Sequence, residues 1–168
     1  MSGAGLHDDD GRRLLEIESL RIGNLTPRWN LFATYTYNTT EYVRDRTVTG
    51  APSVNQGQPI ASWTPEHMFP LWTNYAPPIA SDRLTVGGGV SAQTKIYRVL
   101  NAGTVNMTQP SYATLALRVG YQLNDRWSLA LNGNNLLDKK YYSRMNLVDQ
   151  GSVYGEPRNV LMTLQGRF

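Results

Sequence analysis

The stretch Ala113-Thr-Leu-Ala-Leu-Arg-Val-Gly-Tyr-Gln-Leu123 alternates between apolar and polar side chains. Its odd-numbered positions are alanine, leucine, valine or tyrosine, whereas its even-numbered positions include threonine, arginine and glutamine. A repeat of two residues is the period of a β-strand, because successive side chains of a strand point to opposite faces. The stretch therefore predicts a strand with one apolar face and one polar face.

The same alternation appears on both sides of this strand. Six further stretches show it, at residues 14–22, 29–38, 68–75, 84–97, 127–134 and 159–168. The first is less regular, but in the other strands the apolar face carries no charge, and the opposite face holds Lys95, Arg118 and Arg167. The sequence thus predicts an all-β chain with about seven antiparallel strands in a meander.

Composition excludes several classes of protein. Only 17% of the 168 residues are charged, against about 25% in an average soluble protein. No stretch has the roughly 18 uncharged apolar residues of a membrane helix. There is no cysteine, which rules out disulfides and thiolate zinc sites. The 16 basic residues form no stripe, so nucleic acid is not an expected partner, and no spaced catalytic set indicates an enzyme.

The connections between the predicted strands alternate in length. Short connections cover residues 23–28, 76–83 and 124–126, and long ones cover 38–66, 98–111 and 137–158. Outer-membrane barrels have short turns at one end and long loops at the other, with one strand face toward lipid and one toward the lumen. Aromatic or large apolar residues lie near both strand ends, as in interfacial girdles: Trp29, Tyr75, Tyr121, Trp127 and Phe168 at the short-turn end, and Tyr37, Phe69 and Ile96 at the other.

Two motifs resemble a known family. The run Asn134-Asn-Leu-Leu-Asp-Lys-Lys-Tyr-Tyr142, with the strand before it, resembles the penultimate strand of TonB-dependent outer-membrane receptors. Tyr154-Gly-Glu-Pro-Arg-Asn159 and the strand after it resemble the C-terminus of ferric-siderophore receptors in that family. The resemblance covers residues 14–168, which we expect to be a C-terminal barrel segment. Residues 1–13 are unassigned and expected to be disordered, and they lack the pattern of a secretory signal.

The resemblance implies a fold and a function. The fold would be a partial segment of a barrel of about 22 strands that encloses a plug domain. The function would be TonB-dependent import of ferric siderophores at the cell outer membrane. Expected partners are outer-membrane lipid, a ferric siderophore and the TonB energy-coupling complex. No plug or coupling box is recognisable in this sequence, so we expect the chain to be inactive alone. Iron would arrive bound to the siderophore, so no cofactor or metal site is expected in this chain.

Candidate ligand contacts lie on the polar face near the long connections. By strand parity they are Gln93, Lys95, Tyr97, Tyr112, Asn132 and Asn134. Aromatic rings offer apolar contact, and Lys95 could attract an anionic chelate; hydrogen bonding within the barrel wall is the alternative role for each residue.

Other motifs favour structural roles. The asparagine-rich run at 134–142 suits a turn where the strand leaves the membrane. Arg158 suits an ion pair with a carboxylate, with contact to an anionic ligand as the alternative. Gly87-Gly-Gly89 suits a close approach of backbones or a bend of the barrel. His67 has no partner spaced for a metal site.

Two further classes of protein remain open. A small self-contained barrel could act as a passive pore or structural membrane protein, if the N-terminus added an eighth strand. A soluble β-sandwich could act as a binding module, with one strand face in its core and the other in water.

Overall fold

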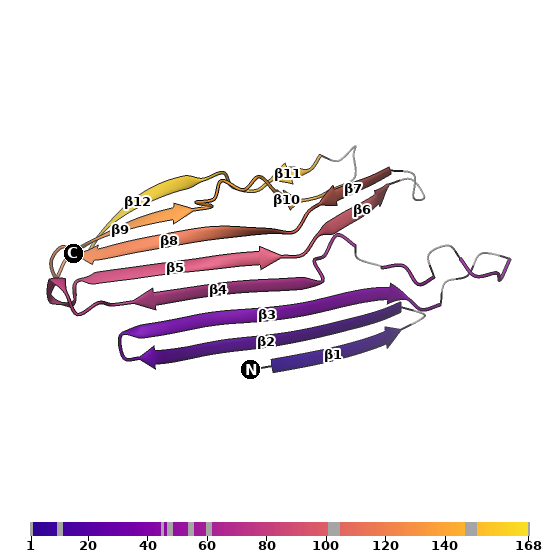
Figure 1. Ribbon diagram of the computed structural model, residues 1–168, viewed down its shortest axis with the longest axis horizontal. Helices are drawn as coiled ribbons and strands as arrows, with labels where there is room; N and C mark the ends of the chain where they lie inside the picture. The colour runs from indigo at the N-terminus through magenta and orange to yellow at the C-terminus, as the bar shows by residue number, and fades with distance from the viewer. Residues whose placement is uncertain are drawn as a thin grey trace.

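The fold is an antiparallel β-sheet with two small hairpins at one end (Figure 1). The computed structural model describes residues 2–9, 12–44, 46, 49–53, 56–59, 62–100, 105–146 and 151–167. The main sheet contains β1 (Ser2–Asp9), β2 (Arg12–Thr26), β3 (Trp29–Tyr42), β4 (His67–Tyr75), β5 (Leu84–Gln93), β8 (Tyr112–Gln122), β9 (Trp127–Asn134) and β12 (Asn159–Gly166), in that spatial order. The hairpins are β6 (Ile96–Leu100) with β7 (Val105–Gln109), and β10 (Tyr142–Arg144) with β11 (Val153–Tyr154), and a short 3-10 turn, η1, covers Ala80–Asp82.

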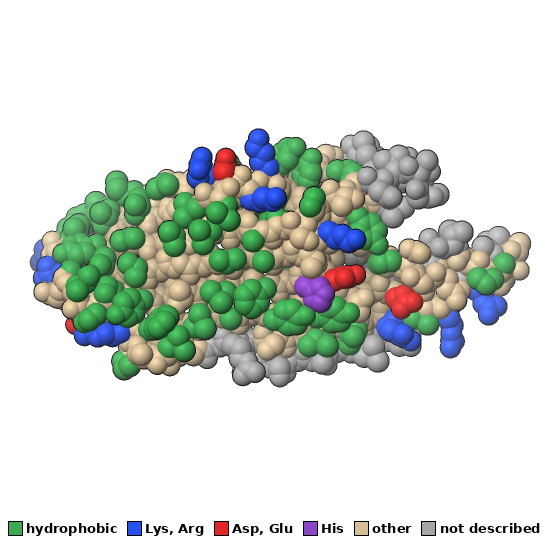
Figure 2. Space-filling model, in the orientation of Figure 1, with side chains coloured by type: hydrophobic (Ala, Val, Ile, Leu, Met, Phe, Trp, Pro, Cys, Tyr) green, Lys and Arg blue, Asp and Glu red, His purple; other side chains and the backbone are tan. Residues whose placement is uncertain are grey.

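The strand register confirms the predicted apolar face. Val119 of β8 lies opposite Val86 of β5 and Leu131 of β9, and Leu131 lies opposite Met162 of β12. Because directly paired residues share a face, the apolar positions of neighbouring strands form one continuous surface. Figure 2 shows this surface, with hydrophobic side chains spread over the strands and charged ones gathered mainly toward the edges of the molecule.

This sheet has no conventional core. Among the side chains that the structure describes, the only buried apolar ones besides Pro77 are Ile96, 7% exposed, and Met145, 5% exposed, both at the end with the long connections. Met162 and Leu131, in contrast, are 67% and 46% exposed. A soluble sandwich would cover such a face with a second sheet, and the sandwich interpretation therefore does not fit. No helix within the described residues has the length and apolar character needed to cross a membrane.

The two ends of the sheet differ as predicted. The turns that join β2 to β3, β4 to β5 and β8 to β9 gather at one end, and the long connections and both hairpins gather at the other (Figure 1). Trp29 and Tyr75 meet edge to face at the short-turn end, with ring centroids 6.1 Å apart, as expected for an interfacial girdle. Phe168 lies outside the described residues, so its predicted position stays a prediction.

The stretch at 84–97 is not one strand, in contrast to the prediction. It divides at Thr94 and Lys95, where the Thr94 amide donates at 3.0 Å to the carbonyl of His67, the first residue of β4. Beyond this point β6 leaves the main sheet and pairs with β7. Ile96, predicted on the lipid-facing side, is consequently buried.

Ser2–Asp9 forms the edge strand β1, although we expected no ordered structure before residue 14. It pairs with β2 over eight residue positions, with Leu6 opposite Leu15 and Ala4 opposite Ile17. This stretch has weak strand propensity. Its pairing with the long strand β2 holds it in a strand nevertheless. β1 and β12 lie at opposite edges of the sheet, and within the described residues they do not pair with each other. The sheet is therefore open.

Candidate functional site

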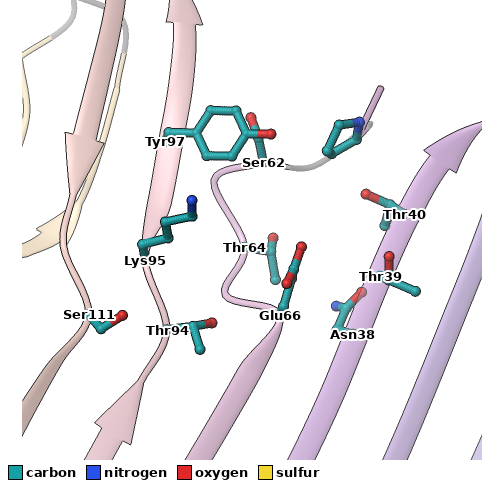
Figure 3. A pocket seen from close by; sticks show the side chains of 11 residues that line it. Asn38, Thr39, Thr40, Ser62, Thr64, Glu66, Thr94, Lys95, Tyr97 and Ser111 are labelled. Atoms are coloured by element: carbon teal, nitrogen blue, oxygen red, sulfur yellow. The ribbon is translucent and has the colours of Figure 1, made fainter. Parts of the chain in front are cut away.

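A polar pocket lies at the long-connection end, between β3 and the junction of β5 and β6 (Figure 3). β4 begins only at His67, so residues 62–66 run between the flanking segments without forming a strand. The pocket lies where these residues face the two flanking segments. The Asn38 amide donates to the Glu66 carbonyl at 2.8 Å, and the Tyr97 amide donates to the Ser62 carbonyl at 2.9 Å. The cavity measures about 240 Å³ and is lined by Asn38, Thr39, Thr40, Pro59, Ser62, Thr64, Glu66, Thr94, Lys95, Tyr97 and Ser111.

The pocket combines hydroxyl groups with one cation and one anion. Figure 3 shows Lys95 and Glu66 on either side of Thr64. Within the described residues, neither charged side chain forms an ion pair shorter than 4.0 Å. Both charges therefore remain available to a ligand, and the surrounding threonine and serine hydroxyls can donate or accept hydrogen bonds. The site is suited to a polar ligand that carries a negative group for Lys95.

The other candidate residues do not line this pocket: some are hydrogen-bonded within the sheet, and Asn132 lines another groove. Tyr112 donates from its hydroxyl to Gln93 Oε1 at 3.1 Å. Asn134 Nδ2 donates to Asn159 Oδ1 at 3.1 Å, across β9 and β12. Asn132 lines a different groove of about 610 Å³ toward the short-turn end, which Arg118 and Thr163 also line. Only Lys95 and Tyr97 of the six predicted contacts thus line the polar pocket, and the ligand role of all six remains a prediction.

The asparagine-rich motif after β9 forms a turn, as the sequence indicates. Asn135 is 5% exposed, and its Nδ2 donates to the carbonyls of Lys139 and Glu156, at 2.9 Å each. Its Oδ1 accepts from the Lys139 amide at 2.9 Å. Asn135 and Asp138 have φ values of 47° and 51°, a left-handed conformation that Asn and Asp tolerate best after glycine. Asp138 also accepts from the Arg158 amide and lies 4.0 Å from its guanidinium, which confirms the predicted pairing of Arg158.

A second cluster of contacts joins the long connections to one another. Arg98 of β6 lies over the ring of Trp63, with its guanidinium carbon 4.5 Å from the ring centroid, and donates to the Met145 carbonyl at 3.2 Å. Gln109 of β7 is bonded to the backbone of Tyr142. These contacts join residues 33 to 47 positions apart in the chain, and neither periodicity nor a motif in the sequence indicates them.

Aromatic rings form two stacks at the same end. Tyr112 stacks on Tyr141 and Tyr142 stacks on Tyr154, each pair with centroids 4.5 Å apart. The hydroxyls of Tyr142 and Tyr154 are 3.1 Å apart, and this hydrogen bond raises the pKa of Tyr142 above its ordinary value. Tyr142 therefore remains neutral at physiological pH. Its stack on Tyr154 adds an uncharged aromatic surface at the long-connection end of the sheet.

The described residues contain no converging group of three or more His, Cys, Asp or Glu side chains that could hold a metal ion. His67 instead lies on the apolar face, opposite Tyr37 in the strand register. Its Nδ1 is 2.9 Å from the Tyr35 hydroxyl, and its ring centroid lies 4.9 Å from that of Tyr37. This arrangement gives His67 a packing role among aromatic side chains.

Comparison with known proteins gives consistent matches. The family model described as "TonB dependent receptor-like, beta-barrel" matches residues 15–136. The chain is 39% identical over 146 residues to the ferric-pyoverdine M114 receptor PbuA of Pseudomonas sp. (strain M114), covering 87% of this chain and 17% of that receptor. It is 29% identical over 168 residues to the catecholate siderophore receptor Fiu of Escherichia coli (strain K12), covering 98% of this chain and 21% of that receptor.

The structural match agrees. The ferripyoverdine receptor of the outer membrane of Pseudomonas aeruginosa, solved bound to ferripyoverdine, superposes with a TM-score of 0.75 at 29% identity, over 92% of this chain and 19% of that one. The chain thus spans about a fifth of the length of the relatives it matches. The all-β fold and the outer-membrane location expected from the sequence are confirmed. The family model, the relatives and the open sheet with one apolar face agree: this chain belongs to the TonB-dependent receptors and forms part of their outer-membrane β-barrel.

Proposed function

We propose that this chain is part of the wall of a receptor that imports ferric siderophores with energy from the TonB complex. The observation that carries the proposal is the polar pocket at the long-connection end, on a sheet whose opposite face is apolar. Lipid would cover the apolar face, and a plug would cover part of the polar face. Relatives that bind ferric pyoverdine or catecholate siderophores support this assignment.

The pocket would hold one anionic arm of the ferric siderophore. Lys95 would attract a carboxylate or another negative group, because it has no ion-pair partner among the described residues and a charge-assisted hydrogen bond is strong. Glu66 would accept hydrogen bonds from hydroxyl or amine groups of the same arm. Iron would remain bound to the siderophore as cargo, so its coordination would need no protein ligand. The protein's part in recognition would be hydrogen bonding, charge and aromatic contact.

A chimera tests this function. The matching segment of a ferripyoverdine receptor would be replaced by this chain, and uptake of radioactive iron from a panel of ferric siderophores would be measured in receptor-deficient cells. We expect uptake of at least one siderophore, abolished when the TonB protein is deleted. Cells that express this chain alone should show none, because the sheet is open and cannot enclose a lumen by itself.

Charge substitutions in the chimera give a finer test. Lys95→Gln should raise the KM of uptake about fivefold to tenfold while the maximal rate is kept, because a charge-assisted hydrogen bond to the ligand is lost. Lys139→Gln is the matched control, since Lys139 is exposed and lies outside the pocket. An assembled chimera that takes up no siderophore, or uptake by the chain alone, would contradict the proposal.

A further inference from the structure

One side chain of β6 contacts the two neighbouring long connections. The Arg98 guanidinium lies 4.5 Å from the ring centroid of Trp63, which belongs to the connection between β3 and β4. Its Nε donates at 3.2 Å to the carbonyl of Met145, one residue beyond the end of β10. Met145 is 5% exposed, so the acceptor of this hydrogen bond belongs to a buried residue. Arg98 therefore links segments that the main sheet leaves unconnected.

The hairpin that carries Arg98 has a second attachment to the segment around β10. Gln109 is 4% exposed; its Oε1 accepts from the Tyr142 amide at 2.8 Å and its Nε2 donates to the Tyr142 carbonyl at 3.4 Å. The side chain replaces a strand partner for both backbone groups of Tyr142. Because the strand register pairs Ile96 with Gln109 across the β6–β7 hairpin, both attachments belong to one hairpin.

These contacts position one wall of the polar pocket. Trp63 lies between Ser62 and Thr64 in the chain, and both of these residues line the pocket. The Ser62 carbonyl accepts from the Tyr97 amide, next to Arg98. Arg98 itself does not line the pocket and already has two protein partners. Its charge is thus directed to Trp63 and Met145 rather than to a ligand.

We propose that Arg98 is a positioning residue that holds the Ser62–Thr64 wall against β6 and the β10 segment, so that these long connections recognise the ligand as one rigid unit. The proposal rests on the proposed function, because it concerns affinity at the pocket assigned there. Arg98 acts through Trp63, and its effect on uptake is an effect on binding rather than on transport.

Uptake kinetics in the chimera test this role. Arg98→Gln should raise the KM for the imported ferric siderophore about threefold to fivefold, with the maximal rate unchanged, since a cation–π contact and one hydrogen bond are lost. Arg98→Lys should give an intermediate KM, because lysine keeps the charge but lacks a planar guanidinium that reaches both partners. Trp63→Leu should raise KM similarly, and combining it with Arg98→Gln should add little, as expected for two residues that act together. Arg144→Gln is the matched control, an exposed arginine on β10.

Hydrogen exchange gives a readout that does not depend on transport. In the assembled chimera without ligand, Arg98→Gln should speed amide exchange at residues 62–66 and at Tyr97, and Arg144→Gln should not. Unchanged exchange in Arg98→Gln would overturn the proposal, and a raised KM with unchanged exchange would make Arg98 a direct ligand contact. A fully additive effect of Arg98→Gln and Trp63→Leu on KM would overturn it as well. If the unsubstituted chimera assembles but takes up no siderophore, the proposed function fails, and the exchange experiment still decides whether Arg98 holds this wall.

Discussion

At the scale of single residues, Trp72 explains the glycine run in β5. Gly89 lies opposite Trp72 in the strand register. A Cβ at Gly89 would lie 2.4 Å from Trp72 Cε3 and 2.6 Å from the Leu71 carbonyl oxygen, and one at Gly87 would lie 2.5 Å from Asn74 Oδ1. Gly87 and Gly89 are therefore required mainly by the side chains of Trp72 and Asn74 and by the β4 backbone, and not by an unusual backbone angle. The sequence indicated a close approach of backbones or a bend, but not the part played by these side chains.

Substitution of Gly89 should consequently destabilise the barrel. We expect Gly89→Ala to lower the free energy of unfolding by about 1–3 kcal/mol, because the added methyl forces Trp72 and the neighbouring backbone apart. Gly23→Ala is the control, since a Cβ at Gly23 would have no atom within 4 Å. The measurement is the temperature at which the assembled receptor loses its compact, detergent-resistant form. Equal temperatures for the two variants would show that Trp72 is free to move aside.

At the scale of elements, an ion pair joins two neighbouring short turns. Arg28, between β2 and β3, donates two hydrogen bonds to the Asp82 carboxylate of η1, one of them 3.1 Å long. Ala80, Ser81 and Asp82 all have positive φ values, 55°, 55° and 60°, which cost free energy for residues other than glycine. The hydrogen bonds from Arg28 hold the pKa of Asp82 below its ordinary value of 3.8. The pair thus favours an otherwise unfavourable turn.

The lowered pKa of Asp82 predicts a pH dependence with a definite sign. Its stabilising contribution is present in full above the ordinary carboxyl pKa, and is lost as the pH falls through the lowered value. The urea concentration at which half the protein is unfolded should be higher for the wild type than for Asp82→Asn at pH 6. This difference should vanish at strongly acidic pH. Because both groups are exposed, 1 M salt should also shrink it. Asp125→Asn, in another short turn, controls for loss of a carboxylate; a constant difference across pH would exclude the ion pair as the cause.

Alternation predicted the main strands but not the elements at the long-connection end. β3, β8 and β9 begin within one residue of their predicted starts, because one face of each is uniformly apolar. β10 and β11 have three and two residues, too few for a period to appear. The pocket likewise depends on where β4 begins and on the distant contact of Arg98 with Trp63. Parity therefore indicated Lys95 and Tyr97 but could not show that Gln93 and Asn134 have protein partners.

At the scale of the whole molecule, the open sheet requires partners on both edges. β1 and β12 each have one hydrogen-bonded neighbour among the described strands. Lipid offers no donors or acceptors to an unpaired strand edge, so such an edge is costly within the membrane. We therefore expect further strands of a larger barrel to pair with these two edges. The passive-pore alternative requires instead that β1 pair with β12 and close a barrel of eight strands.

Cysteine cross-linking separates these two possibilities, and the chain contains no native cysteine to interfere. In the chain refolded alone in detergent, Leu131→Cys and Met162→Cys should form a disulfide readily, because these residues are direct partners across β9 and β12. Ala4→Cys with Met162→Cys, which joins the two edge strands, should not. The first pair reports that the sheet has formed, so failure of the second then means an open edge. A disulfide between Ala4→Cys and Met162→Cys, together with ion conductance in bilayers, would instead establish a closed eight-stranded barrel. That result would contradict the role of this chain as a segment of a larger barrel.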